Sequence, residues 1–170
     1  MVPVIMLFSF IILTYNSSSY INVCLDSVLK IARDSIKNGE SEIVLFDNAS
    51  QDNTVTIAQN YAQKIKIQKS DKNLGYAKGI NAASQYASGD FLVLINPDSR
   101  LIKFDFDKIK DEFVKESKLA AIGFEVEDFD SNKEKTAGKF FNHMTFLLYA
   151  LGLEGIAGLR FSPSKRRYVD

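Results

Sequence analysis

Strand-like runs that alternate with segments of helical spacing constrain the fold of this chain more than any other feature. The runs cover residues 8–13, 43–46, 65–68 and 91–95. Two of them are continuously apolar and a third is interrupted only by Ser9, which is typical of strands buried on both faces of a parallel sheet. Helices between such strands form right-handed crossovers. The sequence therefore predicts an α/β fold with a mostly parallel sheet flanked by helices.

The individual runs also predict an order in the sheet. The run at 91–95 is the most apolar and is expected to be the central strand. The run at 65–68 alternates apolar and polar residues, which favours a strand nearer an edge.

Apolar residues at three- and four-residue spacing predict the helices between these strands. The first helix is expected to cover about 15 residues and to end at Asn38-Gly39. The second follows a cap at Asp52 or Asn53, and the third is broken by Gly89. Later elements are indicated more weakly: a helix over 105–117, a strand over 119–126, a charged loop over 128–135 and a helix over 140–151.

The apolar stretch at the amino terminus, residues 2–13, has the length of a signal-peptide core. No Lys or Arg precedes it and no small-residue cleavage site follows it. It is too short to cross a bilayer as a helix. Its aromatic and β-branched residues from Phe8 onward instead favour a buried strand.

Composition excludes several classes of function. The chain of 170 residues has 21 Lys+Arg and 21 Asp+Glu, so a bulk basic surface for nucleic acid is absent and we expect no nucleic-acid partner. The single cysteine, Cys24, excludes an intrachain disulfide and a cysteine zinc site, and a reducing, cytoplasmic location is the default. The single histidine, His143, disfavours a Ser-His-Asp triad and is interpreted as structural.

Polar clusters follow three of the predicted strands: Thr14-Tyr15-Asn16, Asp47-Asn48 and Asn96-Pro97-Asp98. Ligands of parallel α/β sheets bind at the carboxyl ends of the strands, where these clusters lie. Asn96 and Asp98 are two residues apart at a strand end, and the two-residue period of a strand predicts that both side chains point to the same face. Asp98 offers a hard oxygen to Mg²⁺ or Mn²⁺, and Asn96 suits a ribose hydroxyl. Turn chemistry alone is the alternative explanation for both residues.

Two further segments have both a functional and a structural interpretation. Asp47 could accept a hydrogen bond from the imide of a pyrimidine, or it could cap a helix or an Asx turn. Residues 73–79 resemble a phosphate-cradling turn before a helix, or a turn that simply needs glycine. Lys78 could neutralise a phosphate or remain solvated. The segment lacks both the Walker A pattern and the dinucleotide fingerprint.

Taken together, four motifs in this order resemble the family 2 glycosyltransferases, and most closely their rhamnosyltransferase-like branch. The resemblance covers about residues 7–130. The motifs are Ile12-Leu13-Thr14-Tyr15-Asn16, then Asp47 to Asp52, then Asn73-Leu74-Gly75-Tyr76-Ala77 with Gly79 and Asn81, then Leu94 to Asp98.

This resemblance implies a GT-A fold, which is Rossmann-like, and a donor that is a nucleotide-diphosphate sugar. It implies inverting, metal-assisted transfer to a hydroxyl of a glycan or lipid-linked acceptor, in polysaccharide or glycoconjugate synthesis. Asn96-Pro97-Asp98 matches the family's Asp-X-Asp position, so Asp98 is the implied ligand of Mg²⁺ or Mn²⁺. The implied donor-binding residues are Thr14, Tyr15, Asn16, Asp47, Asn48, Asn73, Gly75, Tyr76 and Asn96.

The family's catalytic base lies in a later Glu-Asp motif after a Gly-Gly-Phe-Asp-like segment. That pattern is not found before Asp170, and Glu127-Asp128 comes too early, so the base is unassigned. We expect a single GT-A-like domain over 1–170, with residues 131–170 incomplete or partly irregular. The resulting hypothesis is a truncated product or fragment that binds donor but transfers sugar poorly.

Two alternatives stay open for function. One is a nucleotide-sugar-binding module without catalysis. It would differ from the enzyme in lacking a correctly placed catalytic carboxylate after Asp98. The other is a different nucleotide-dependent α/β enzyme, but residues 14–20 lack the glycine and lysine that a nucleotidyltransferase would need there.

The basic run 165–167 is either a solvated tail or a contact to anionic lipid at the cytoplasmic membrane face, or to phosphate. The apolar segment 140–160 could pack on a partner, which leaves a homo-oligomer open.

Overall fold

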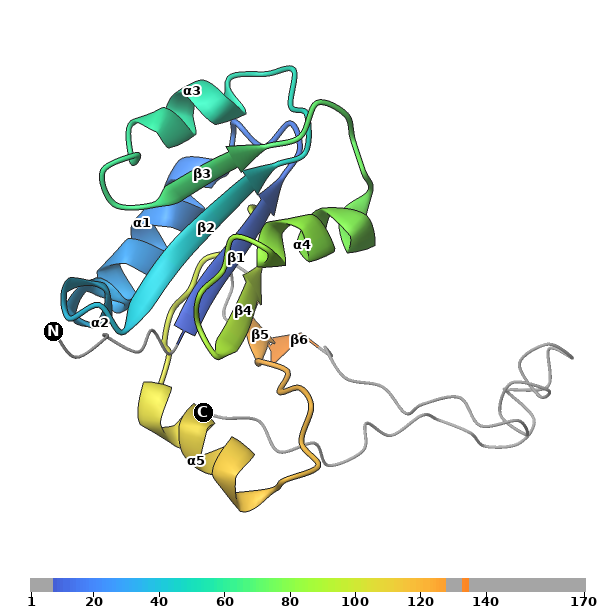
Figure 1. Cartoon of the computed structure of the whole chain (residues 1–170). Helices are drawn as coiled ribbons and strands as arrows, with labels where there is room; N and C mark the ends of the chain where they lie inside the picture. Colours follow the sequence, from blue (N-terminus) through green and yellow to red (C-terminus); the bar gives the residue numbers. More distant parts are fainter. Residues whose placement is uncertain (1–7, 128–132, 135–170) are drawn as a thin grey trace, which may run out of the picture. The chain divides into compact units, whose positions relative to one another are not determined.

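Four parallel strands form the sheet at the centre of the computed structural model, which describes residues 8–127 and 133–134 (Figure 1). β1 (Phe8–Thr14) lies between β2 (Ser41–Asp47) and β4 (Phe91–Ile95), and β3 (Lys66–Lys69) follows β2. The predicted α/β class and the edge position of the third strand are therefore confirmed.

The register of the sheet aligns the carboxyl ends of its strands. Thr14 pairs with Asp47, and Asp47 pairs with Lys69. On the other side of β1, Ile12 pairs with Ile95. Because all pairings are parallel, the loops that leave these strands emerge at one edge of the sheet.

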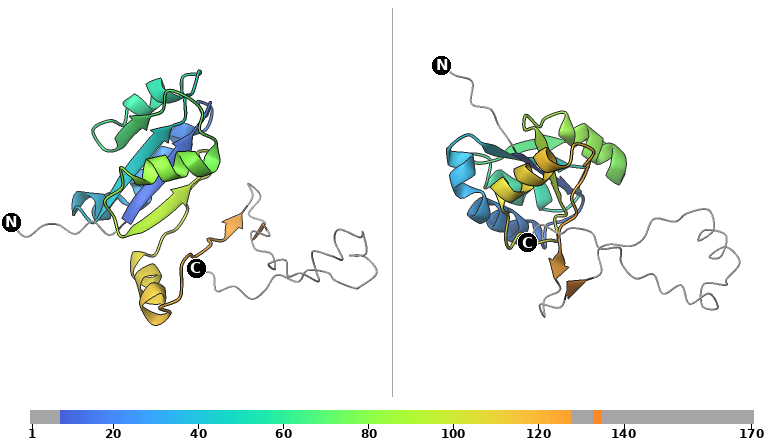
Figure 2. Two further views of the ribbon diagram at one scale, coloured as in Figure 1. Left: turned by 45° about the vertical axis from the view of Figure 1, so that its right-hand side comes forward. Right: turned by 90° about the horizontal axis from the view of Figure 1, so that it is seen from below.

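Helices cover both faces of this sheet (Figure 2). The helices are α1 (Ile21–Ile31), α2 (Arg33–Lys37), α3 (Thr54–Gln59) and α4 (Tyr76–Ser84). α1 and α3 contact each other on one face, whereas α4 packs on β1 and β2 from the other. Every residue of β1 is buried, which explains its continuous apolar pattern.

The core has a mainly aliphatic part and a second part made of aromatic rings. On the α4 side, Ile11, Leu13 and Phe46 pack with Ala83 of the helix. Elsewhere the ring of Phe8 stacks on Phe91 at 5.0 Å between centroids and meets Phe104 edge-on at 5.5 Å.

The predicted central position of the strand at 91–95 is wrong for the described sheet. β4 is the last strand on its side, and Leu92 and Leu94 are 48% and 47% exposed. Leu94 pairs with Ile11 and so shares the face that α4 covers, but α4 packs on β1 and β2. The apolar content of residues 91–95 therefore did not indicate the position of β4 in the described sheet.

The helix expected after the first strand is divided in two. Ala32, with φ −90° and ψ 9°, leaves helical geometry and separates α1 from α2. The predicted end at Asn38-Gly39 is confirmed, and Gly39 has a φ of 74° that favours glycine. The next two helices are shorter than the pattern indicates, since α3 ends at Gln59 and α4 at Ser84.

The described residues up to Phe104 belong to one compact unit, and a second unit begins at Asp105. In the second unit the predicted helix is confirmed as α5 (Phe106–Lys115), and the carboxylate of Asp105 caps it by accepting from the Lys108 N–H. Of the strand predicted over 119–126, Val126 alone is in a strand: β5 (Val126–Glu127) pairs with β6 (Lys133–Glu134), part of the expected loop. The elements predicted at 140–151 and 165–167, and His143, lie outside the described residues.

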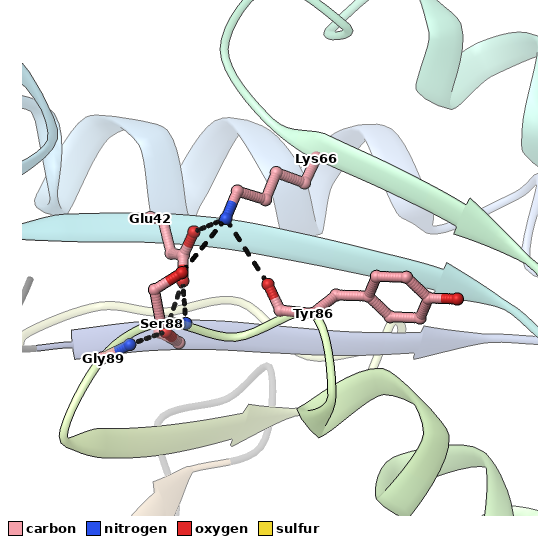
Figure 3. A network of polar contacts seen from close by, with 6 residues as sticks. Glu42, Lys66, Tyr86, Ser88 and Gly89 are labelled. Carbon is pink, nitrogen blue, oxygen red and sulfur yellow. Dashed lines mark hydrogen bonds and ion pairs between the residues drawn. The ribbon is translucent and has the colours of Figure 1, made fainter.

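A buried carboxylate ties the starts of three strands together (Figure 3). Glu42 of β2 accepts hydrogen bonds from the Ser9 hydroxyl at 2.8 Å and from the Ser88 N–H at 2.5 Å. Its second oxygen pairs with the ammonium of Lys66 on β3. Burial acts to raise the pKa of Glu42, but hydrogen bonds from Lys66, Ser88 and Ser9 outweigh it and hold that pKa below its usual value.

Because the pKa of Glu42 is lowered by folding, its ionised form stabilises the protein above the usual glutamate pKa, and this stabilisation is lost as pH falls. We expect Glu42→Gln to reduce the free energy of unfolding by about 1–3 kcal/mol near neutral pH. The difference should shrink in acid, as measured by denaturant titration at several pH values. The exposed Glu40→Gln is the matched control, and an undiminished difference in acid would contradict the assignment.

The approach of residue 89 to β1 yields a second prediction. A Cβ on Gly89 would lie 2.8 Å from the Phe8 carbonyl carbon and from the Ser9 nitrogen, both backbone atoms of the most buried strand. We expect Gly89→Ala to cost about 1–3 kcal/mol of stability in thermal or denaturant unfolding. Gly123→Ala, whose Cβ meets nothing within 4 Å, should change stability by less than about 0.5 kcal/mol. Equal effects would refute the clash.

Candidate functional site

Residues that leave the carboxyl ends of the strands gather along one edge of the sheet. We call residues 14–18, 47–52, 73–76 and 96–98 the strand-end rim. The parallel register places the first two segments side by side, and β4 brings the last one next to β1. The structure thus brings together the polar clusters that the sequence placed at strand ends.

Asp47 links two of these segments. Its carboxylate accepts from the Thr14 hydroxyl at 3.0 Å and from the Ser50 N–H at 2.9 Å. The N–H of Asn48 donates to the Thr14 carbonyl at 2.8 Å. Asp47 is 2% exposed, so its carboxylate holds the ends of β1 and β2 in a fixed turn.

The buried amide of Asn48 holds the loop before α4. Its Nδ2 donates to Asn73 Oδ1 at 3.0 Å and to the Gly75 carbonyl at 3.3 Å, and its Oδ1 accepts from the Leu74 N–H at 2.8 Å. Asn73 Oδ1 also accepts from the Gly75 N–H at 2.8 Å. One side chain at the end of β2 therefore fixes where α4 begins.

The amino terminus of α4 opens onto the rim. Gly75 precedes it with a φ of 74°, and no side chain caps the first turn within the described residues. The helix packs tightly on the end of β1, since a Cβ on Gly79 would lie 2.8 Å from Leu13. Uncapped N–H groups at a helix start favour an anion such as phosphate, and the exposed Lys78 lies in this turn.

A second set of polar contacts, which the sequence analysis did not anticipate, orders the loop after β1. Ser17 N–H donates to the Thr54 hydroxyl at 2.7 Å, and Asn16 N–H donates to the Ser50 hydroxyl at 2.9 Å. The partners are 34 and 37 residues apart in the sequence, so no local pattern indicates these contacts. Asn16 has a positive φ of 50°.

Of the two predicted caps of α3, Asp52 supplies the carboxylate, whereas Asn53 occupies the N-cap position without a side-chain capping hydrogen bond. The Asp52 carboxylate accepts from both the N–H and the hydroxyl of Thr54, and from the N–H of Ser18. Burial works to raise the pKa of Asp52, but these hydrogen bonds outweigh it and lower that pKa well below its usual value. Asp52 therefore joins the loop after β1 to the start of α3.

Two tyrosines of the rim present their rings to solvent. Tyr15 is 47% exposed and Tyr76 is 60% exposed. Exposed aromatic rings beside a polar edge can stack on a planar ligand.

The segment after β4 is a turn rather than a continued strand. β4 ends at Ile95, and the Ser99 N–H donates to the Asn96 carbonyl at 3.0 Å. The two-residue strand period therefore does not apply to Asn96 and Asp98. Both are exposed, and the carboxylate of Asp98 forms no ion pair within residues 8–127 and 133–134.

The donor set of the rim fits a metal bridged by a ligand better than a protein cage. No group of three His, Cys, Asp or Glu side chains in the described ranges could enclose an ion. Asp98 is an accessible hard oxygen donor, and Mg²⁺ often binds one or two carboxylates together with substrate phosphates. The residues present thus fit such an ion.

Cys24 lies beneath this turn. Its Sγ donates to the Asn96 carbonyl at 3.6 Å. Burial, together with the nearby negative charge of Asp98, raises the pKa of the Cys24 thiol to about 12.

We therefore expect Cys24 to resist thiol reagents in the folded protein near about pH 8, because little thiolate is present and the sulfur is buried. Ellman's reagent should react with it once guanidinium chloride unfolds the chain. Rapid labelling of the native protein would contradict this environment.

The fold is that of the GT-A glycosyltransferases. The crystal structure of Staphylococcus aureus TarS 1–349 in complex with UDP is 31% identical and covers 65% of this chain and 32% of that one, with a TM-score of 0.55. A mannosyltransferase from Pyrobaculum calidifontis, in complex with GDP-Man and Mn²⁺, matches with a TM-score of 0.56 over 74% of this chain and 37% of that one; at 22% identity it supports the fold alone.

The model of the family described as "Glycosyl transferase family 2" matches residues 9–163, so the chain belongs to that family. A poly(ribitol-phosphate) beta-N-acetylglucosaminyltransferase, TarS of S. aureus, is 33% identical over 58% of this chain and 17% of its own length. A PGL/p-HBAD biosynthesis glycosyltransferase of Mycobacterium bovis is 33% identical over 58% of this chain and 38% of its own length. The chain thus spans less than two fifths of these relatives.

Proposed function

We propose that the strand-end rim binds a nucleotide-diphosphate sugar and that the protein transfers the sugar to an acceptor hydroxyl. The observation that carries this proposal is the Asn48 amide, which sets the open start of α4 beside the ends of β1 and β2. The likeness to a TarS structure in complex with UDP-GlcNAc, 31% identical over 64% of this chain and 30% of that one with a TM-score of 0.52, supports the same donor class.

The nucleoside would bind near the end of β1. Tyr15 stacks on the base with its exposed ring, while Thr14 and Asn16 shape the pocket wall. The Asp47 carboxylate would accept a hydrogen bond from the imide N–H of a pyrimidine. Each of its oxygens accepts one hydrogen bond, from Thr14 or from Ser50, and keeps a further lone pair for the base. Asn96, which follows β4 beside β1, would serve the ribose hydroxyls.

The diphosphate would bind at the start of α4. Asn73 and Gly75 set the loop, Asn48 holds it, and Tyr76 borders the sugar. The uncapped N–H groups of the first turn stabilise phosphate oxygens without a further charge.

We place a Mg²⁺ or Mn²⁺ ion at Asp98. When bound, this ion would offset the negative charge that develops on the departing nucleotide diphosphate. The exposed carboxylate of Asp98 supports this assignment. Asn96 precedes Asp98 in the same turn, and its side chain would orient the ribose.

The proposed reaction inverts the configuration at the anomeric carbon of the sugar. The acceptor oxygen forms a bond to that carbon as the bond to the diphosphate oxygen breaks, and the electron pair leaves with the diphosphate. A carboxylate must take the proton of the acceptor hydroxyl. We assign no base among the described residues.

The sugar and acceptor are proposed at the level of class. The proposed sugar is rhamnose or a related sugar, as in the rhamnosyltransferase-like branch, and the proposed acceptor is a glycan or a lipid-linked acceptor in polysaccharide or glycoconjugate synthesis. Two relatives, a poly(ribitol-phosphate) beta-N-acetylglucosaminyltransferase and a dolichyl-phosphate beta-glucosyltransferase, support acceptors of this kind. We also propose a cytoplasmic location with peripheral membrane contact, and a homo-oligomer is compatible with this proposal.

Among the helices that the structure describes, none has the length and apolar character of a membrane span.

Calorimetric titration of UDP or GDP, with and without Mn²⁺, tests the donor site. We expect Asp98→Ala to weaken Mn²⁺-dependent affinity by about tenfold or more, equal to about 1.4 kcal/mol, while thermal stability is unchanged because the side chain is exposed. Asp90→Ala, an exposed aspartate at the opposite end of β4, is the matched control.

Unchanged Mn²⁺-dependent affinity in Asp98→Ala would remove that residue from the site, and absence of nucleotide binding would remove the site itself. A transfer assay with radiolabelled donor then separates an enzyme from the alternative, a nucleotide-sugar-binding module. Donor binding without turnover would favour the module.

A further inference from the structure

A cationic pocket lies away from the strand-end rim, between α1, α2 and the segment that follows α3. Its volume is about 460 Å³, within the size range of small-molecule sites. Four basic residues line it: Lys30, Arg33, Lys37 and Lys64. In Figure 1, α2 lies near the end of the sheet from which the strands start, opposite the rim.

The positive charge of this pocket is not neutralised by the protein. None of the four basic residues forms an ion pair within the part of the chain that the structure describes. The one acid among the lining residues is Asp26. The pocket therefore gathers an excess of positive charge in a chain whose formal net charge is zero.

Asp26 is already engaged by a neighbouring phenol. The Tyr61 hydroxyl donates to Asp26 Oδ1 at 3.0 Å and also lies 3.3 Å from Asn22 Oδ1. Burial, with the hydrogen bond and charge of Asp26, raises the pKa of Tyr61, so its phenol stays neutral. The ring is thereby held in place as one wall of the pocket.

The pocket also has an apolar floor. Leu29 and Ile36 are half-buried and line it together with the Tyr61 ring. A ligand with a short carbon skeleton could cover these side chains, while its charged part meets the basic residues. A bare inorganic ion would leave the floor uncovered.

From these features we infer that the cationic pocket binds an organic phosphate. The phosphate oxygens pair with Lys30, Arg33, Lys37 and Lys64, since charge-assisted hydrogen bonds to phosphate are strong and Arg can form them in pairs. The carbon skeleton of the ester lies on Leu29 and Ile36. This pocket shares no residue with the strand-end rim, so it is a site separate from the proposed donor site.

The same phosphate ester can come from solution or from a lipid head group, and two probes distinguish these sources. Glycerol 3-phosphate, titrated into the full chain by calorimetry, reports binding of a free ester. Cosedimentation with phosphatidylglycerol vesicles, compared with phosphatidylcholine vesicles, reports binding of a head group. Binding in either arm should weaken as NaCl is raised, because salt screens exposed charges.

The decisive variant is Lys30→Gln/Arg33→Gln, compared with Lys103→Gln/Lys118→Gln, which removes two exposed charges elsewhere. We expect the first pair to weaken binding by about tenfold or more and the second to leave it unchanged. Thermal unfolding confirms that both variants fold, and UDP affinity should be unaffected in both.

Loss of glycerol 3-phosphate binding in the first variant alone supports a soluble ester, and loss of vesicle binding alone supports a lipid head group. No binding of either probe to the unmodified chain, or equal losses in both variants, would overturn the assignment. Since the nucleotide titration is independent, failure here leaves the donor site intact, and failure there leaves the pocket intact.

Discussion

β1 pairs in parallel with β2 on one side and with β4 on the other, and this pairing sets the positions of the loops that form the strand-end rim. All seven residues of β1 are buried, and the strand fixes the register of β2 and of β4. That register brings Thr14, Asp47 and Asn96 to one edge of the sheet. The polar chemistry of the protein can gather there because the apolar core holds the strand ends in place.

Buried polar side chains stabilise the two ends of the strands in different ways, one at the amino ends and the other at the carboxyl ends. At the edge where strands begin, Glu42 joins three strands through a charge that Lys66 offsets. At the opposite edge, Asp47 and Asn48 use hydrogen bonds to hold turns. The first arrangement stabilises the sheet, whereas the second positions loops and an open helix start, which is the requirement for a ligand site.

The sequence predicted β1 and β2 well, because burial of every residue in these two strands leaves apolar runs that need no knowledge of their neighbours. It could not place β4, since Leu92 and Leu94 are as apolar as core residues and remain half-exposed. The partners of Glu42 lie 24 to 46 residues away, at Lys66 and Ser88, so no local pattern marked it. The motif order located the rim, but the burial of Asp47 depends on a turn that only the folded chain reveals.

A ¹⁵N chemical-shift titration of the chain with UDP and a diamagnetic divalent ion, Mg²⁺, tests whether the nucleotide binds at the strand-end rim. We expect the largest shifts of backbone amides at residues 14–18, 47–52 and 73–78, and a response to the ion in the turn at 96–98. Shifts that instead centred on the cationic pocket, or spread without a focus, would contradict a nucleotide-sugar site at the strand-end rim.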